Sequence, residues 1–182
     1  LHLSLRRQRQ MCIRDRWSLP AGTQKSITNF KMKTLYFSYG SNMNLKQMQE
    51  RCPDSKKIGI GFMNDAEICF PSFYESWNGG VAGYKTSIGK KLWGVLFELT
   101  VSDVEKLRVF EGYIHGREAH LNAYNEVKVP IDIDGETVEC MTYEITVMGN
   151  FRPSLRYLQT IVRGAEENNL PEEYIESLSQ HL

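Results

Sequence analysis

Two short segments carry the residue types best suited to chemistry. The first begins at Leu35 as a strand-like stretch and then enters a turn, Gly40-Ser41-Asn42, that leads into a helix-like stretch. Unpaired backbone N–H groups at the start of a helix attract a carboxylate or an oxyanion. The second segment holds Glu111 between Phe110 and Gly112 at the end of an expected helix. An anion cradle together with an apolar-flanked carboxylate indicates acyl chemistry in which Glu111 moves the proton.

The local sequence leaves plainer alternatives open for both segments. The turn is also compatible with an ordinary strand–turn–helix connection that is capped by Ser41 or Asn42. Glu111 is compatible with a helix end that lies in water. Gly40 suits either a positive φ or the close approach of a substrate to the backbone.

Strands and short helices must position these segments. Expected strands cover residues 34–39, 57–70, 81–88, 92–99, 121–131 and 137–145, with a turn at 77–80, a tip at 89–90 and a hairpin at 134–135. Expected helices cover residues 44–51 and 102–109, the second behind a capping box at 102–105, and two more begin near residues 154 and 171. In the first of these two, Leu155, Leu158, Ile161, Val162 and Ala165 share one face.

This order of elements predicts the fold class. We expect an α+β domain whose mixed, antiparallel-rich β-sheet curls into a small barrel, flanked by short helices and one longer C-terminal helix. A regular βαβ alternation, which a doubly wound parallel sheet requires, is absent from the pattern.

Bulk properties exclude several classes of protein. The chain has 182 residues, enough for one domain with a proper core. Lys and Arg together number 22, as do Asp and Glu, so the formal charge is zero and a nucleic-acid partner is not expected. No apolar run approaches the roughly 20 residues that span a bilayer, so no membrane partner is expected.

Residues 1–31 do not have the sequence character of a folded domain. Residues 1–16 are strongly basic and show no helical or strand periodicity, and no apolar segment or cleavage site follows them. We expect the native start at Met32, with residues 1–31 a non-native or disordered leader and residues 32–182 the domain. A functional basic arm is the alternative.

Cysteine and histidine spacing indicates neither a disulfide framework nor a metal site. The four cysteines, Cys12, Cys52, Cys69 and Cys140, form no C-x-x-C pair, which favours reduced thiols in a cytoplasmic protein. The histidines at 115 and 120 form no metal-ligand spacing, so we expect them to be solvated or structural. A hydrolase triad on Ser41 is disfavoured because no G-x-S-x-G elbow is present.

Four blocks of the sequence resemble the gamma-glutamylcyclotransferase family. The blocks are Tyr-Phe-Ser-Tyr-Gly-Ser-Asn-Met at 36–43; Gly-Gly-Val-Ala at 79–82 with Leu-Trp-Gly-Val-Leu-Phe at 92–97; Leu-Arg-Val-Phe-Glu-Gly at 107–112; and Pro-Ser-Leu-Arg-Tyr at 153–157 with 164–165 and 170–174. They stand in the family's order and cover nearly everything after Met32. Arg108 departs from the pattern, because the family usually has aspartate there.

The resemblance implies a fold, a reaction and roles for residues. The reaction cyclises a gamma-glutamyl amide to 5-oxoproline without metal or cofactor, as in glutathione metabolism, with Glu111 as proton acceptor and later donor. The residues implied to bind substrate are Tyr36, Phe37, Ser38, Tyr39, Gly40, Ser41, Asn42 and Tyr157. The implied partner is a small gamma-glutamyl molecule, and a homodimer is compatible with the family. The alternatives are cyclotransfer on a specialised gamma-glutamyl conjugate and a non-catalytic small-molecule-binding module on the same scaffold.

Overall fold

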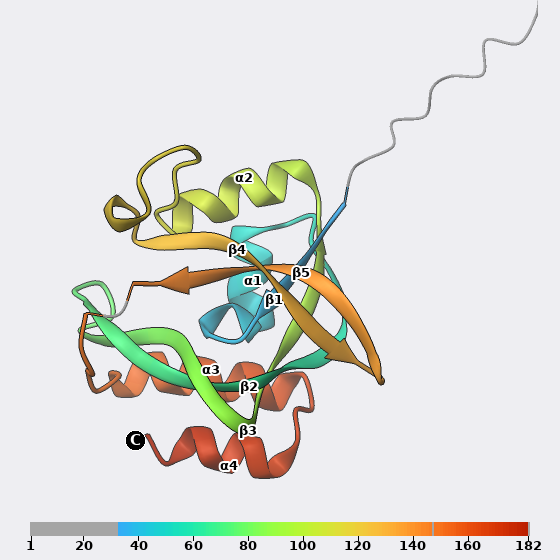
Figure 1. Ribbon diagram of the computed structural model, residues 1–182, viewed down its shortest axis with the longest axis vertical. Helices are drawn as coiled ribbons and strands as arrows, with labels where there is room; N and C mark the ends of the chain where they lie inside the picture. Colours follow the sequence, from blue (N-terminus) through green and yellow to red (C-terminus); the bar gives the residue numbers. More distant parts are fainter. Residues whose placement is uncertain (1–32, 147, 182) are drawn as a thin grey trace, which may run out of the picture. The chain divides into compact units, whose positions relative to one another are not determined.

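A closed barrel forms the centre of the structure, a computed structural model that describes residues 33–146 and 148–181. Its strands are β1 (Thr34–Ser38), β2 (Lys56–Tyr74), β3 (Gly79–Leu99), β4 (Tyr124–Ile133) and β5 (Glu136–Ile145), in the order β1-β3-β2-β4-β5 (Figure 1). Neighbouring strands are antiparallel except β1 and β5, which pair in parallel. The prediction of an α+β fold with a curled, antiparallel-rich sheet is confirmed. The predicted leader, residues 1–31, lies outside the described residues.

The long hairpin of β2 and β3 corrects one expectation. The segments 81–88 and 92–99 are parts of a single strand, because Thr86 pairs with Ala66 and Lys91 pairs with Asn64 along the same neighbour. The residues between these pairs bulge outward, and the N–H of Gly89 donates to Asp65 Oδ1 at 2.8 Å. The glycine therefore marks a bulge within one strand and not a reversal of the chain.

Helices begin at side-chain caps that the sequence largely supplies. The helices are η1 (Ser41–Met43), α1 (Leu45–Arg51), α2 (Val101–Phe110), η2 (Ala119–Leu121), α3 (Leu155–Glu167) and α4 (Glu172–Ser179). Asn44 caps α1 and Ser154 caps α3. The capping box of α2 consists of Thr100 and Asp103, two residues before the expected position. Leu155 is exposed, because the buried face is centred on Ile161 and Leu155 lies to one side of it.

Helix α3 fixes the position of the bend that follows β1, which is the Gly40-Ser41-Asn42 turn. A Cβ added at Gly164 would lie 2.5 Å from the backbone nitrogen of Asn44, so the helix backbone packs directly on the end of η1. The amide of Asn168 donates to Met43 O at 2.8 Å. Helices α3 and α4 lie side by side along one side of the barrel, and α2 lies on the opposite side in Figure 1. The bend is thus held between the barrel and α3.

Candidate active site

The carboxylate of Glu111 and the bend after β1 meet in space. Glu111 caps the C-terminus of α2, where its N–H donates to Leu107 O at 2.9 Å and its carbonyl accepts from Tyr124 N at 3.2 Å. Asn42 lies in η1, and its Nδ2 donates to Glu111 Oε1 at 2.9 Å. These two residues lie 69 positions apart in the sequence, so the fold itself creates the contact. The two segments that the sequence singled out therefore meet in the structure.

Helix α1 adds two polar side chains that the sequence reasoning missed. Arg51 Nη1 donates to Asn42 Oδ1 at 2.8 Å and lies 3.4 Å from Glu111 Oε1. Gln47 Nε2 donates to Ser41 Oγ at 2.9 Å and to Asn42 Oδ1 at 3.1 Å. A signal existed in the chain: α1 starts directly after the bend, so residues one and two turns along it face back toward the bend.

Most of the predicted site residues line one small pocket. The pocket is lined by Tyr36, Ser38, Tyr39, Gly40, Ser41, Asn42, Ala82, Glu111, Tyr124, Thr142, Tyr143 and Tyr157. Phe37 is not in this lining; it is fully buried beside Gly94, because successive side chains of β1 point to opposite faces. The sequence reasoning missed four of these residues, since Ala82, Tyr124, Thr142 and Tyr143 lie on strands whose register depends on distant pairing.

Backbone geometry explains how two tyrosines and a glycine are placed at the pocket. Strand β1 ends at Ser38, and the chain then turns, so Tyr36 and Tyr39 both reach the pocket. Gly40 has a φ of −111°, so a positive φ, one of the two reasons considered for a glycine here, does not apply. A Cβ at Gly40 would lie 3.2 Å from Ala82 Cβ, so tight packing is the observed reason for a glycine.

Tyrosine hydroxyls form hydrogen bonds with residues of the pocket wall. Tyr36 OH accepts from Asn42 Nδ2 at 3.0 Å, and Tyr157 OH accepts from Ala82 N at 3.0 Å. Tyr124 OH donates to Ala82 O at 2.8 Å. Because Tyr36 and Tyr157 accept in these bonds, each retains a hydroxyl proton that it can donate to a ligand. Burial raises the pKa of both groups, that of Tyr157 to about 12, so both are neutral at physiological pH.

The electrostatic setting of Glu111 favours proton exchange. Burial raises the pKa of Glu111 above its ordinary value, and the nearby Arg51 guanidinium and the Asn42 amide oppose that rise. Arg108, the departure from the family pattern, is bound elsewhere: its Nε and Nη2 donate to the Glu126 carboxylate at 2.7 and 2.9 Å. The charge of Arg108 is therefore paired with the Glu126 carboxylate, and Arg108 is not among the causes of the pKa shift of Glu111.

Other candidate chemistry receives no comparable support. Within residues 33–146 and 148–181, no cluster of three His, Cys, Asp or Glu side chains is placed to hold a metal ion. His115 and His120 are exposed, as expected for solvated histidines. In the same part of the chain, no helix is long and apolar enough to cross a membrane.

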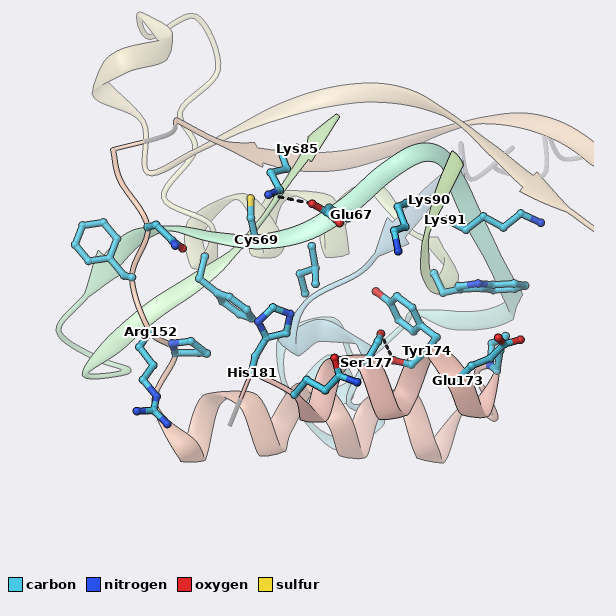
Figure 2. A pocket seen from close by; sticks show the side chains of 18 of the residues that line it. Glu67, Cys69, Lys85, Lys90, Lys91, Arg152, Glu173, Tyr174, Ser177 and His181 are labelled. Atoms are coloured by element: carbon cyan, nitrogen blue, oxygen red, sulfur yellow. Dashed lines mark hydrogen bonds and ion pairs between the residues drawn. The ribbon is translucent and has the colours of Figure 1, made fainter. Parts of the chain in front are cut away.

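A wider groove of about 890 Å³ lies on another part of the barrel, between β2, β3 and α4 (Figure 2). Its lining includes neither Glu111 nor any residue of the bend. Lys85 on its wall is paired with Glu67 at 2.9 Å, the dashed contact in Figure 2. The larger volume of this groove therefore comes without the paired acid and amide, Glu111 and Asn42, which line the small pocket.

Comparison with known proteins points to one family. The model of the AIG2-like family matches residues 91–178. The gamma-glutamylcyclotransferase of Mus musculus is 32% identical over 148 residues, covering 79% of this chain and 76% of its own length. That of Bos taurus is 30% identical over 150 residues, covering 80% and 77%. A solved gamma-glutamyl cyclotransferase structure superposes with a TM-score of 0.74 at 28% identity, covering 81% of this chain and 87% of its own.

Proposed function

Because this chain belongs to the gamma-glutamylcyclotransferase family, we propose that it converts a gamma-glutamyl amide to 5-oxoproline with Glu111 as the group that moves the protons. The observation that carries the assignment of Glu111 is its 2.9 Å contact with Asn42, the last residue of the Gly-Ser-Asn turn. One small bound molecule can then touch both the carboxylate and the turn.

The reaction needs no group beyond the substrate and the protein. The substrate's own α-amine attacks its γ-carbonyl carbon, so a carbon–nitrogen bond closes a five-membered lactam. Glu111 takes a proton from the α-ammonium group and returns one to the leaving amine as the original amide bond breaks. The attacking nitrogen gives up its second proton as it becomes the neutral lactam nitrogen, and the departing amine takes up that proton to become an ammonium group. A positioned acid–base of this kind contributes typically 10²–10⁴-fold in rate. Its raised pKa makes the protonated form, which the second step requires, accessible.

The bend supplies donors for the negative charge of the substrate. Within the described residues, the backbone N–H groups of Gly40, Ser41 and Asn42 donate no hydrogen bond to the protein. Backbone donors aimed at a developing oxyanion are worth about 3 kcal/mol each. The tyrosine wall, with Tyr36 and Tyr157 keeping free hydroxyl protons, closes the site around the glutamyl group.

Three narrower statements belong to the same proposal. The leaving group is an amino acid or an amine, and a specialised conjugate is the alternative substrate. A cytoplasmic location is supported by free thiols at Cys52, Cys69 and Cys140. A homodimer stays a prediction, which sedimentation of the purified protein tests.

A purely binding module is disfavoured because it has no need of a buried acid at the turn.

Glu111→Gln tests the role of the acid. The purified protein is incubated with a panel of gamma-glutamyl dipeptides and gamma-glutamyl amines, and released 5-oxoproline is measured. We expect the variant to fold and to lose turnover by about 10²–10⁴-fold. Glu118→Gln is the matched control, because that carboxylate is 76% exposed and lies outside the pocket. Full activity of Glu111→Gln would refute its role, and no product from any substrate would favour the binding module.

A further inference from the structure

Arg51 reaches the general base, yet the reaction scheme above gives it no task. It ends helix α1, while Glu111 ends helix α2, so two helix ends bring the charges together. Arg51 Nη1 contacts both Asn42 Oδ1 at 2.8 Å and Glu111 Oε1 at 3.4 Å. Its guanidinium carbon lies 5.0 Å from the centre of the Phe110 ring. A planar cation held on three sides is a rigid support and not a mobile surface charge.

The two oxygens of the Glu111 carboxylate are in different situations. Both hydrogen bonds that reach the carboxylate from the described residues, from Asn42 and from Arg51, end on Oε1. Oε2 receives neither hydrogen bond, and it is not one of the fully buried polar atoms that lack a hydrogen-bond partner. The carboxylate is therefore anchored through one oxygen, and the other is open to the pocket.

Arg51 also determines the charge around the base. Among the described groups that act electrostatically with Glu111, Arg51 is the one cation, and the others are hydroxyls and a thiol. They are Tyr36 on β1, Tyr39 after it, Cys52 after α1, Tyr74 on β2, Tyr124 on β4, Tyr143 on β5 and Tyr157 on α3. Burial raises the pKa of every one of these neighbours, so they are uncharged near neutral pH.

We propose that Arg51 is a positioning residue for the cyclisation: it anchors Oε1 of Glu111 and keeps the carboxylate ionised until the substrate's ammonium group arrives at Oε2. The inference rests on the proposed role of Glu111. The proton passes from the α-ammonium group to Oε2 and then to the leaving amine. Arg51 exchanges no proton, because a guanidinium stays protonated throughout this range.

Arg51→Met tests the proposal through the pH dependence of kcat/KM. The acidic limb of that profile reports the base in the free enzyme. Without the guanidinium, burial raises the pKa of Glu111 unopposed by a cation, so the limb moves to higher pH. Loss of the anchor lowers kcat by about 10- to 100-fold. KM stays close to that of the unaltered enzyme, because Arg51 does not line the pocket.

Two further variants separate positioning from a structural role. Arg51→Lys keeps the charge and loses the planar fork, so we expect its acidic limb near that of the unaltered enzyme and part of kcat restored. Lys46→Met, an exposed cation on the same helix, is the matched control and should change neither value. If Arg51→Met does not fold, Arg51→Gln, which keeps a donor to Asn42 without the charge, provides the same comparison.

Defined outcomes overturn the proposal. An acidic limb that stays in place in Arg51→Met or Arg51→Gln shows that the guanidinium does not hold the base ionised. A raised KM with unchanged kcat assigns Arg51 to substrate binding instead. An equal loss in the Met and Lys variants, with no movement of the limb, reduces the residue to a packing role. In each case inactivity of Glu111→Gln still supports the proposed function, so the two failures are distinguishable.

Discussion

Glu111 carries a conflict between stability and chemistry. Its pKa in the folded protein is raised by burial, so the folded chain binds this proton more readily than the unfolded chain does. Stability is then greatest below the pKa of the unfolded chain and falls as the pH rises toward the pKa of the folded state. An ionised carboxylate in the pocket is thus a destabilising feature that proton transfer requires.

Glu111→Gln should therefore unfold at a higher temperature than the unaltered protein near neutral pH. Glutamine has no charge to bury, and it can still accept a hydrogen bond from Asn42. The stability gap between the two proteins should narrow as the pH falls into the range where Glu111 is protonated in both states. Thermal unfolding at a series of pH values measures the gap. A gap that does not vary with pH would show that burial of the charge is not its cause.

Individual residues also show how much of the candidate site could be predicted from the sequence. The turn and Glu111 could be singled out because each stands within a short block of suggestive residue types, but the local sequence left a plain helix cap and a solvated helix end open. The 2.9 Å contact between Asn42 and Glu111 was predictable only through the family resemblance. The partner of Arg108 could not be predicted from the sequence. Its guanidinium pairs with Glu126, which lies on β4, so only the fold brings the two charges together.

At the scale of elements, local signals predicted local structure well. Asp134-Gly135 forms the β4–β5 turn with φ values of 52° and 86°, as the hairpin signal requires. The split of β3 was mispredicted, because a bulge and a turn use the same glycine signal and only the pairing with β2 separates them. The closure of the barrel through β1 and β5 joins the two ends of the sheet and has no local signal.

The contact of α3 with the bend gives a prediction for this scale. In Gly164→Ala the new Cβ would lie 2.5 Å from Asn44 N and 2.7 Å from Met43 C, both backbone atoms that cannot rotate away. We expect the variant to be destabilised by about 1–3 kcal/mol, despite the better helix propensity of alanine. We also expect KM to rise, because the displaced η1 carries the donors of the bend.

Thermal unfolding and steady-state kinetics measure the two effects. Gly59→Ala is the control, because no atom lies within 4 Å of a Cβ added there. Equal unfolding temperatures for the two variants would show that α3 does not press on the bend. A destabilised Gly164→Ala with unchanged KM would show that the bend keeps its shape without this contact.

On the scale of the molecule, the barrel acts as the frame on which distant segments meet. The pocket takes Tyr36 and Ser38 from β1, Tyr124 from β4, Tyr143 from β5 and Tyr157 from α3. None of these elements forms the pocket by itself, so ligand binding and the closure of the barrel are coupled. A ligand that touches several walls should therefore stabilise the whole domain against unfolding.

The same reasoning predicts which part of the chain is sufficient. Every residue that lines the pocket falls between positions 36 and 157, and β1 completes the barrel from Thr34, which pairs with Leu99. We therefore expect a protein that starts at Met32 to unfold at the same temperature as the full chain and to release 5-oxoproline with the same kcat/KM. A deletion of residues 1–39 is the contrast, because it removes β1 and should abolish folding. A loss of stability or turnover on removing residues 1–31 alone would favour the functional basic arm.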